Sequence, residues 1–259
     1  MSPLEAAGVD ETARPRSLGR LALLGILALL AFAGLVALGN WQVARRAWKL
    51  DLIARVESRV HAPPAAAPGP PDWPNVTAAL DEYRRLRISG AYLNDKATLV
   101  QAATSLGAGF WVVTPMRTDQ GFLVLINRGF VPGDSRADVG QAGSRIEGEA
   151  TVIGLMRMTE PKGGFLRAND PAGDRWYSRD VAAIAAARGL ANVAPYFVDA
   201  DATPNPGGLP VGGLTVITFP NSHLVYAITW YALALMLAGG ASYVAREEWR
   251  ARRRPTRDS

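Results

Sequence analysis

Residues Leu21–Gly39 read LALLGILALLAFAGLVALG, a run of 19 residues without a charged side chain. A second uncharged run, LVYAITWYALALMLAGGASYVA, covers the 22 residues from Leu224 to Ala245. A helix needs about 20 predominantly apolar residues to cross the hydrocarbon core of a bilayer. The two runs therefore predict a membrane protein with two transmembrane helices, at residues 21–39 and 223–245 of a 259-residue chain.

The first run has an alternative interpretation as the apolar region of a cleaved signal peptide. It is longer than such a region usually is, and Gly39-Asn40-Trp41 leads into amphipathic sequence rather than a small-x-small cleavage site. The second run is too long for an ordinary core helix, and a basic segment follows it. We therefore expect both runs to span the membrane.

The distribution of arginine predicts the orientation. Residues 246–259 contain six arginines, and residues 1–20 contain Arg14, Arg16 and Arg20. Short basic flanks stay on the cytoplasmic side, so both tails are expected there and residues 40–222 outside. The basic residues just after the first span oppose this orientation, but long exported regions largely escape the rule; they are Arg45, Arg46 and Lys49.

The exported region divides into three parts. Residues 40–61 are typical of a juxtamembrane amphipathic helix on which Trp41 and Trp48 share a face, either at headgroup depth or on a solvated helix whose apolar side packs on the domain. Residues 62–75 hold six prolines and predict an extended linker. Residues 76–222 are expected to form the folded domain.

That domain has the pattern of an α+β fold with more strand than helix. One helix is expected at 178–188, capped by Ser178 or Asp180 and ended by Gly189. Short runs rich in β-branched and aromatic residues predict strands at 86–93, 97–102, 109–116, 122–126, 149–157, 196–198 and 214–218. The predicted fold class is therefore two transmembrane helices flanking a mixed, β-rich extracytoplasmic domain.

The residue inventory excludes much chemistry. The chain has no cysteine, which rules out disulfides, thiol nucleophiles and thiolate metal sites, and its two histidines, His61 and His223, disfavour an all-protein zinc or copper centre. The three lysines, Lys49, Lys96 and Lys162, lie outside apolar β patterns, which argues against a Ser-Lys protease. Phosphate-loop and dinucleotide motifs are absent, and the net positive charge does not indicate nucleic-acid binding, because the arginines are unevenly placed. We predict neither an enzyme nor a nucleic-acid-binding protein.

One polar group, Asn127-Arg128-Gly129, follows the strongly apolar run 122–126. Arg128 has the geometry to bind a carboxylate bidentately, whereas an internal structural pair would fix a corner of the domain. Gly129 permits a backbone bend there. The residues favour the internal structural role over a binding role.

His223 opens the second apolar run. At helical spacing it shares a face with Ala227, Trp230, Ala234, Ala238, Ala241 and Ala245, and small residues mark a side that packs closely on another helix. Ala33 and Ala37 are expected to face it. Neutral imidazole is a ligand for haem iron, with Tyr226 and Trp230 against the porphyrin. An interfacial histidine bonded to headgroups or water remains equally open from the residues alone.

Four motifs occur in order along the chain. They are LGNWQVARRAWK at 38–49, TP at 114–115 with NRGFVP at 127–132, WYSRD at 176–180, and NSHLVYAITWY at 221–231. They resemble the LG-x-WQ-x-x-R-x-x-WK, TP…NRG(W/F)VP, W-x-x-x-D and N-x-HL-x-YA-x-TW segments of the surfeit locus protein-one, or Shy, family of cytochrome c oxidase assembly factors. Phe130 stands where tryptophan is common in that family, and Val225 where a polar residue often lies.

The resemblance implies a role in maturing the haem–copper oxidase, at the step where haem a enters the catalytic subunit. For bacterial members it implies transient haem a binding in the inner membrane, with His223 as iron ligand. The implied partners are the oxidase catalytic subunit, the haem a synthesis machinery and the lipid bilayer. A low-spin haem takes two axial ligands, so a homo-oligomer or the oxidase would supply any second one.

A different interpretation is a cofactor-free membrane scaffold that stabilises an oxidase assembly intermediate through residues 127–132 and the helix faces. A third, a membrane-tethered protease dependent on a lysine such as Lys96, is disfavoured by the inventory above. A haem spectrum distinguishes the first two interpretations.

Overall fold

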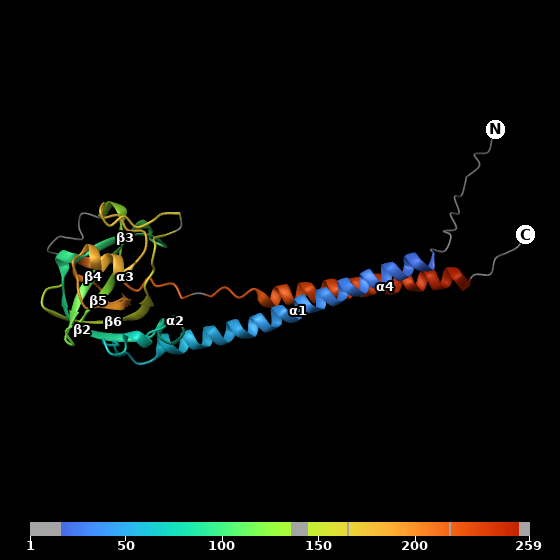
Figure 1. Cartoon of the computed structure of the whole chain (residues 1–259), viewed down its shortest axis with the longest axis horizontal. Coiled ribbons are helices and arrows are strands. Elements are labelled where there is room, and N and C mark those ends of the chain that lie inside the picture. The colour runs from blue at the N-terminus through green and yellow to red at the C-terminus, as the bar shows by residue number, and fades with distance from the viewer. Residues whose placement is uncertain (1–16, 136–144, 165, 218, 254–259) are drawn as a thin grey trace, which may run out of the picture. The chain divides into compact units, whose positions relative to one another are not determined.

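The computed structural model of the chain describes residues 17–135, 145–164, 166–217 and 219–253 (Figure 1). They form two compact units, one reaching to Asp51 and resuming at Phe219, and the other made of residues between Leu52 and Thr218. The helices are α1 (Leu18–His61), α2 (Ala78–Asp81), α3 (Val181–Ala187) and α4 (His223–Arg253). The strands are β1 (Ala65–Ala66), β2 (Arg85–Tyr92), β3 (Thr98–Thr104), β4 (Gly107–Thr118), β5 (Leu123–Pro132), β6 (Glu149–Met158) and β7 (Val193–Ala200).

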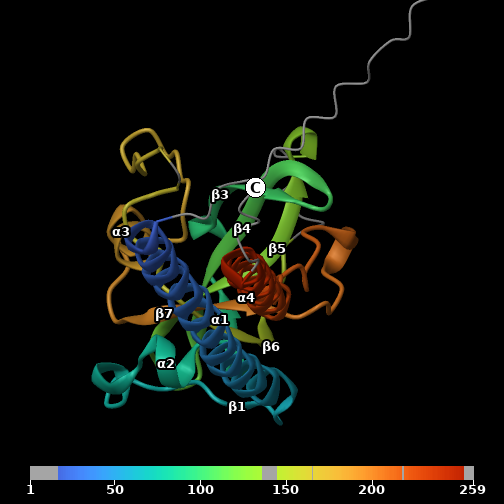
Figure 2. The same ribbon diagram turned by 90° about the vertical axis from the view of Figure 1, so that its right-hand side faces the viewer.

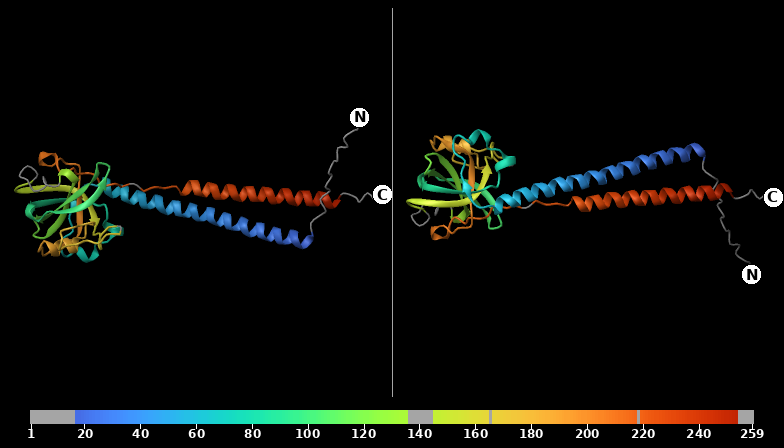
Figure 3. Two further views of the ribbon diagram at one scale, coloured as in Figure 1. Left: turned by 90° about the horizontal axis from the view of Figure 1, so that it is seen from above. Right: turned by 90° about the horizontal axis from the view of Figure 1, so that it is seen from below.

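The first unit is a pair of antiparallel helices, α1 and α4, which run side by side in both views of Figure 3. By length and composition these two helices, alone among the described residues, could cross a membrane. The expected span at 21–39 and the expected juxtamembrane helix at 40–61 are one continuous helix of 44 residues. The basic segment after residue 245 stays helical to Arg253; Arg14, Arg16, Arg254 and Arg257 lie outside the described residues.

The second unit is built on a closed ring of strands. The strand order is β1-β2-β6-β7-β5-β4-β3, and β4 also pairs with β2, which closes a five-stranded mixed barrel. The closing ladder aligns Gly90 with Thr118 and Tyr92 with Met116. Within the ring only β5 and β7 are parallel. In Figure 2, β4 and β5 are visible as long neighbouring strands, and by strand order β1 and β3 lie outside the ring.

The core has two parts because the central strands are covered on both faces. Side chains from all five ring strands meet inside the barrel, including Val124 and Ile126 of β5. Leu125, between them, points outward and packs with Trp176 and with Ile184 of α3. A strand buried on both sides reads as a continuous apolar run, which explains the sequence LVLI at 123–126.

The proline-rich segment 62–75 is part of the domain rather than a linker in front of it. Two of its residues form β1, which pairs in parallel with the edge of β2. Ala67 is buried, and the Trp73 ring packs edge-on against Phe122 with 5.7 Å between ring centroids. The Pro68 carbonyl accepts hydrogen bonds from Trp73 Nε1 and Tyr196 Oη. The prolines exclude helix, as expected, but the segment is attached to the barrel through these contacts.

Six of the seven expected strands coincide with β2 to β7, although β5 continues through the polar group to Pro132. The prediction of a strand at 214–218 is wrong for its described residues, 214–217. Gly213, at φ 72°, turns the chain, and the Thr215 hydroxyl donates to Asp199. Instead, Val211 forms a single bridge to Phe130. Helix α3 is capped by Asp180, whose side chain accepts from the Ala183 amide.

The chain bends at Gly129, which has a positive φ of 135°. A Cβ there would lie 2.2 Å from the Val211 carbonyl oxygen, a backbone atom. We expect Gly129→Ala to lower the free energy of unfolding by about 1–3 kcal/mol because the alanine strains both φ and this contact. Gly133→Ala is the control, since its Cβ would meet the nearest atom at 3.7 Å. Equal denaturation midpoints for the two variants would contradict this account.

Candidate functional site

The helical unit contains a polar seam where α1 and α4 meet. Gly39 is buried, and a Cβ on it would lie 2.6 Å from the Tyr231 ring, so the absence of a side chain lets the helices approach. The Tyr231 hydroxyl donates to Asn40 Oδ1 at 2.7 Å. Three residues after Gly39, on the same side of α1, lies Gln42, which is buried with 8% of its surface exposed.

His223 is the first residue of α4, and its ring reaches the seam. Nδ1 lies 2.7 Å from Gln42 Oε1. Among the described residues, Nδ1 is the ring nitrogen that has a hydrogen-bond partner, and Nε2 has none. Gln42 therefore accepts a hydrogen bond from a histidine that keeps one nitrogen for another ligand.

The alanine face predicted for α4 packs on α1 as far as Ala238, whereas its last two members, Ala241 and Ala245, are exposed. Ala227 and Ala234 are 2% and 3% exposed, in a helix whose other positions are largely open. The expected partners on α1 are wrong, because Ala33 and Ala37 are exposed. Between residues 29 and 45 of α1, the half-buried or buried positions are Phe32, Leu35, Val36, Gly39 and Gln42. The physical reason is that the spacing of residues in α4 predicts which of its faces is buried. It does not predict how α1 is rotated about its own axis.

The two aromatic residues predicted beside the histidine differ in environment. Trp230, seven residues along α4, is half-buried, and its buried Nε1 has no hydrogen-bond partner among the described residues. Tyr226 is 53% exposed. An unpaired buried N–H costs free energy, so the Trp230 Nε1–H is an unsatisfied donor next to the seam.

Trp41 and Trp48 of α1 are both largely exposed, whereas Val56, two turns further on, is buried. The Arg45 guanidinium lies 4.0 Å from the centre of the Trp48 ring. Exposed tryptophans next to arginine at the end of an apolar run are typical of a membrane interface.

An apolar groove of about 690 Å³ runs along the helix pair at the other end of α1. Small residues form its centre, including Gly25, Ala28, Gly240, Ala241 and Ala245. Glu248, Trp249 and Arg252 stand at one end of it.

The barrel carries the polar group predicted at 127–129. Asn127 is buried in β5, where Nδ2 donates to Asp199 Oδ1 at 2.7 Å and Oδ1 accepts from the Gly129 amide. The Arg128 side chain donates to Asn205 Oδ1 from both Nε and Nη2, and its guanidinium lies 5.3 Å from the Tyr92 ring centre. Burial lowers the pKa of Arg128, and burial raises the pKa of Tyr92 to about 12. These contacts hold β5 to neighbouring segments.

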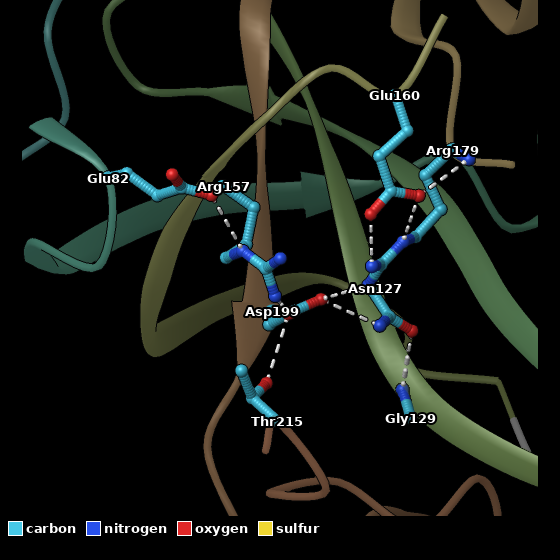
Figure 4. Close-up of polar contacts among 8 residues, drawn as sticks. All are labelled: Glu82, Asn127, Gly129, Arg157, Glu160, Arg179, Asp199 and Thr215. Atoms are coloured by element: carbon cyan, nitrogen blue, oxygen red, sulfur yellow. Dashed lines mark hydrogen bonds and ion pairs between the residues drawn. The ribbon is translucent and has the colours of Figure 1, made fainter. Parts of the chain in front are cut away.

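Asp199, 3% exposed on β7, is the centre of a buried charge network (Figure 4). Its two oxygens accept from Arg179 Nη1 at 2.9 Å, Arg157 Nη1 at 3.0 Å and Thr215 Oγ1 at 3.0 Å, in addition to Asn127. Glu160 pairs with Arg179, and Glu82 lies 3.5 Å from Arg157 Nε. That last contact is an ion pair rather than a hydrogen bond, because Arg157 Nε has no hydrogen-bond partner.

The network shifts the ionisation of its members. Burial raises the pKa of Glu160, but the hydrogen bonds and charge of Arg179 outweigh this and hold the pKa below its usual value. Burial lowers the pKa of Arg179, and the charges of Asp199 and Glu160 reverse that effect and raise it. The guanidinium also lies 4.6 Å from the Phe197 ring centre. Glu160 and Arg179 therefore favour each other's charged form at neutral pH.

Sequence reasoning named Asn127, Arg128, Gly129 and His223 but not their partners. Gln42 and Arg179 lay within quoted motifs, yet no spacing rule joins Gln42 to a residue 181 positions later. Asp199 follows the apolar run YFV at 196–198. A single acidic residue directly after an apolar strand was the one sequence feature that could have indicated a buried carboxylate. Groups of three or more His, Cys, Asp or Glu that could hold a metal are absent from the described residues.

We expect Asp199→Asn to lower the free energy of unfolding by about 3–5 kcal/mol, because two partly buried guanidinium groups lose the buried carboxylate that they share. The control is Asp119→Asn on an exposed turn, expected to change it by less than about 0.5 kcal/mol. Chemical denaturation monitored by tryptophan fluorescence measures both. Similar losses for the two variants would show that the network does not stabilise the barrel.

The Glu160 pair makes stability depend on pH. Because the folded pKa of Glu160 is below the unfolded value, its contribution is present above the unfolded pKa and is lost as pH falls through the folded one. We expect the Tm gap between the wild type and Glu160→Gln to be full at pH 7 and to shrink below about pH 4.3. Glu149→Gln, at an exposed position of β6, serves as the control. A Glu160→Gln gap that stays constant down to pH 3 would refute the pairing.

Comparison with known proteins identifies the family of the chain. Residues 29–235 match the sequence profile of the SURF1 family. The chain is 37% identical to Surfeit locus protein 1 of Homo sapiens over 215 residues, which cover 76% of this chain and 69% of that protein. It is also 37% identical to the SURF1-like protein of Monosiga brevicollis, covering 76% of this chain and 78% of that protein.

A third relative, Surfeit locus protein 1 of Takifugu rubripes, is 33% identical over 222 residues, covering 79% of this chain and 90% of that protein. The matched region contains Gly39, Gln42, the barrel, and α4 from His223 to Leu235. The chain therefore belongs to the SURF1 family, and this membership implies a role in cytochrome c oxidase assembly.

Proposed function

We propose that the chain is a cytochrome c oxidase assembly factor that binds haem a and assists its insertion into the catalytic subunit of the oxidase. Membership of the SURF1 family supports the assembly role. The observation that carries the haem part is His223, whose Nδ1 is engaged by Gln42 and whose Nε2 has no partner among the described residues.

The residues of the seam fit one axial position of a haem. A neutral imidazole with Nδ1 hydrogen-bonded to a carbonyl-type oxygen is the form in which histidine ligates iron through Nε2. Trp230, two helical turns along the same face, adds a buried N–H without a partner in the described chain. In this proposal Trp230 and Tyr226 lie against the porphyrin, and His223 bonds to the iron.

The part played by the chain is binding and orientation. Gly39 and Tyr231 hold the two helices close, Gln42 holds the imidazole, and the alanine face of α4 leaves His223 at its head. The haem supplies redox chemistry to the oxidase that receives it. The proposal assigns the chain no catalysed reaction, and a second axial ligand would come from another copy or from the oxidase.

We place α1 and α4 across the bacterial inner membrane, with both termini cytoplasmic and the barrel on the outer side. The length and apolar composition of both helices support the spans. The arginine-rich flank after α4 and the exposed tryptophans after the first apolar run support the orientation and the interface depth.

A cofactor-free scaffold that stabilises an oxidase assembly intermediate is the second candidate. The observation in its favour is the apolar groove of about 690 Å³ on the helix pair, whose small residues suit close packing of a further helix. The two candidates differ in whether the purified protein carries a pigment.

The test is to purify the full chain from cells that make haem a, record its absorption spectrum and identify the extracted pigment. We expect haem a in the wild type and at least about a tenfold loss in His223→Ala, because the iron loses its protein ligand. His61→Ala is the matched control, since His61 is exposed and bonded to the Glu57 carbonyl.

Undiminished haem in His223→Ala would exclude the ligand role. A colourless wild-type protein that still co-purifies with the oxidase would favour the scaffold.

A further inference from the structure

The contact between Gln42 and His223 specifies more than the position of the ring. The amide oxygen of Gln42 faces Nδ1 at 2.7 Å. An amide oxygen accepts hydrogen bonds and cannot donate them, so Nδ1 must carry the proton. A neutral imidazole has a single N–H, so a proton on Nδ1 leaves the lone pair on Nε2. The contact therefore selects one of two tautomers.

The surroundings of Gln42 strengthen its hydrogen bond to His223. Gln42 is 8% exposed, so its amide is shielded from competing water. Gly39, one turn earlier, brings α4 close, and the bond from Tyr231 to Asn40 at 2.7 Å joins the same two helices. Two polar contacts from one turn of α1 thus oppose sliding of one helix along the other.

His223 depends on α1 for this orientation because it begins α4. Residues in the first turn of a helix lack the full set of backbone hydrogen bonds, so the end of the helix alone holds a side chain loosely. The residue immediately before it, Ser222, is exposed. The ring therefore takes its direction from Gln42.

We infer that Gln42 is a positioning residue, which fixes His223 as the Nδ1–H tautomer and turns Nε2 toward the ligand. The iron ligated by Nε2 rests on the proposed function, whereas the tautomer is a property of the chain itself. Gln42 touches no reacting atom and acts through the imidazole. Histidine ligands of metals commonly donate their other N–H to such a partner, and loss of the partner costs about 10–100-fold in metal affinity.

The first experiment needs no haem. The full chain, labelled with ¹⁵N-histidine in detergent micelles, has two imidazoles, and a His61→Gln background leaves only the signals of His223. At about pH 8.5, roughly two units above the ordinary imidazole pKa, ¹⁵N shifts and couplings identify the protonated nitrogen. We expect Nδ1–H with Gln42 in place and a shift of the population toward Nε2–H in Gln42→Leu.

Two further variants sharpen this experiment. Gln42→Glu keeps an oxygen acceptor, so it is expected to retain Nδ1–H even if Gln42→Leu unfolds the helix pair. Tyr231→Phe removes the bond to Asn40 but leaves Gln42, and it is expected to leave the tautomer unchanged. An Nε2–H tautomer in the unsubstituted seam, or Nδ1–H retained in a folded Gln42→Leu protein, would overturn the inference.

The second experiment separates this inference from the proposed function. Haem titration is expected to give an affinity about 10–100-fold weaker in Gln42→Leu and within about threefold of wild type in Gln42→Glu. Glutamate is also expected to lower the midpoint potential of the bound haem, because its charge makes the imidazole a stronger donor to iron.

If His223→Ala binds haem like the wild type, the ligand role fails while the tautomer result stands. If His223→Ala loses haem but Gln42→Leu binds it like the wild type, the positioning role fails while the ligand role stands.

Discussion

The barrel depends on the burial of one carboxylate, that of Asp199. It is 3% exposed and accepts hydrogen bonds from two arginines, an asparagine and a threonine. These donors come from β5, from β6, from the segment before α3 and from the segment after β7. A charge taken out of water is tolerable only when such partners surround it. The carboxylate is therefore fully paired only when all four donor segments are in their native positions. The network thus favours this one arrangement of strands as well as stabilising it.

The helical unit is held together by fewer polar contacts than the barrel. In the proposed membrane setting, two apolar helices gain little from the hydrophobic effect, so their association relies on close packing and hydrogen bonds. Gly39 supplies the close approach, and the pairs Asn40–Tyr231 and Gln42–His223 supply the bonds. The three α1 residues among them, Gly39, Asn40 and Gln42, lie within about one turn of that helix. The LGNWQ segment at 38–42 is polar although it follows a long apolar run. Its asparagine and glutamine make these two hydrogen bonds between the helices.

Much of this architecture was accessible from the sequence, for identifiable reasons. Uncharged length predicted α1 and α4, and alternation with turn residues predicted six of the seven strands assigned from it. Helical spacing placed His223, Ala227 and Ala234 on one face correctly. These are local patterns, and local patterns are what periodicity reports.

What failed was long-range. The closure of β4 onto β2, the use of residues 62–75 as packing, and the partners of Asp199 depend on residues far apart in the chain. The prediction that Ala33 and Ala37 of α1 face α4 was wrong for a similar reason. The positions of small residues do not show which side of α1 contacts the other helix. The expected strand 214–218 is absent from its described residues, 214–217, where the chain turns at Gly213 and the Thr215 hydroxyl bonds to Asp199. The role proposed for His223 rests on the family resemblance, and its contact with Gln42 could not be read from the sequence.

The position of β7 has a consequence for how the barrel is assembled. β7 is the last strand in the chain, yet it lies between β6 and β5, and it is parallel to β5. During synthesis the ribosome therefore completes β5 and β6 while the edges that β7 will occupy are still open. Contacts of such large sequence separation form slowly, and open strand edges attract other chains. The time between the emergence of Met158 and that of Ala200 is thus the interval in which the nascent domain most needs protection from aggregation.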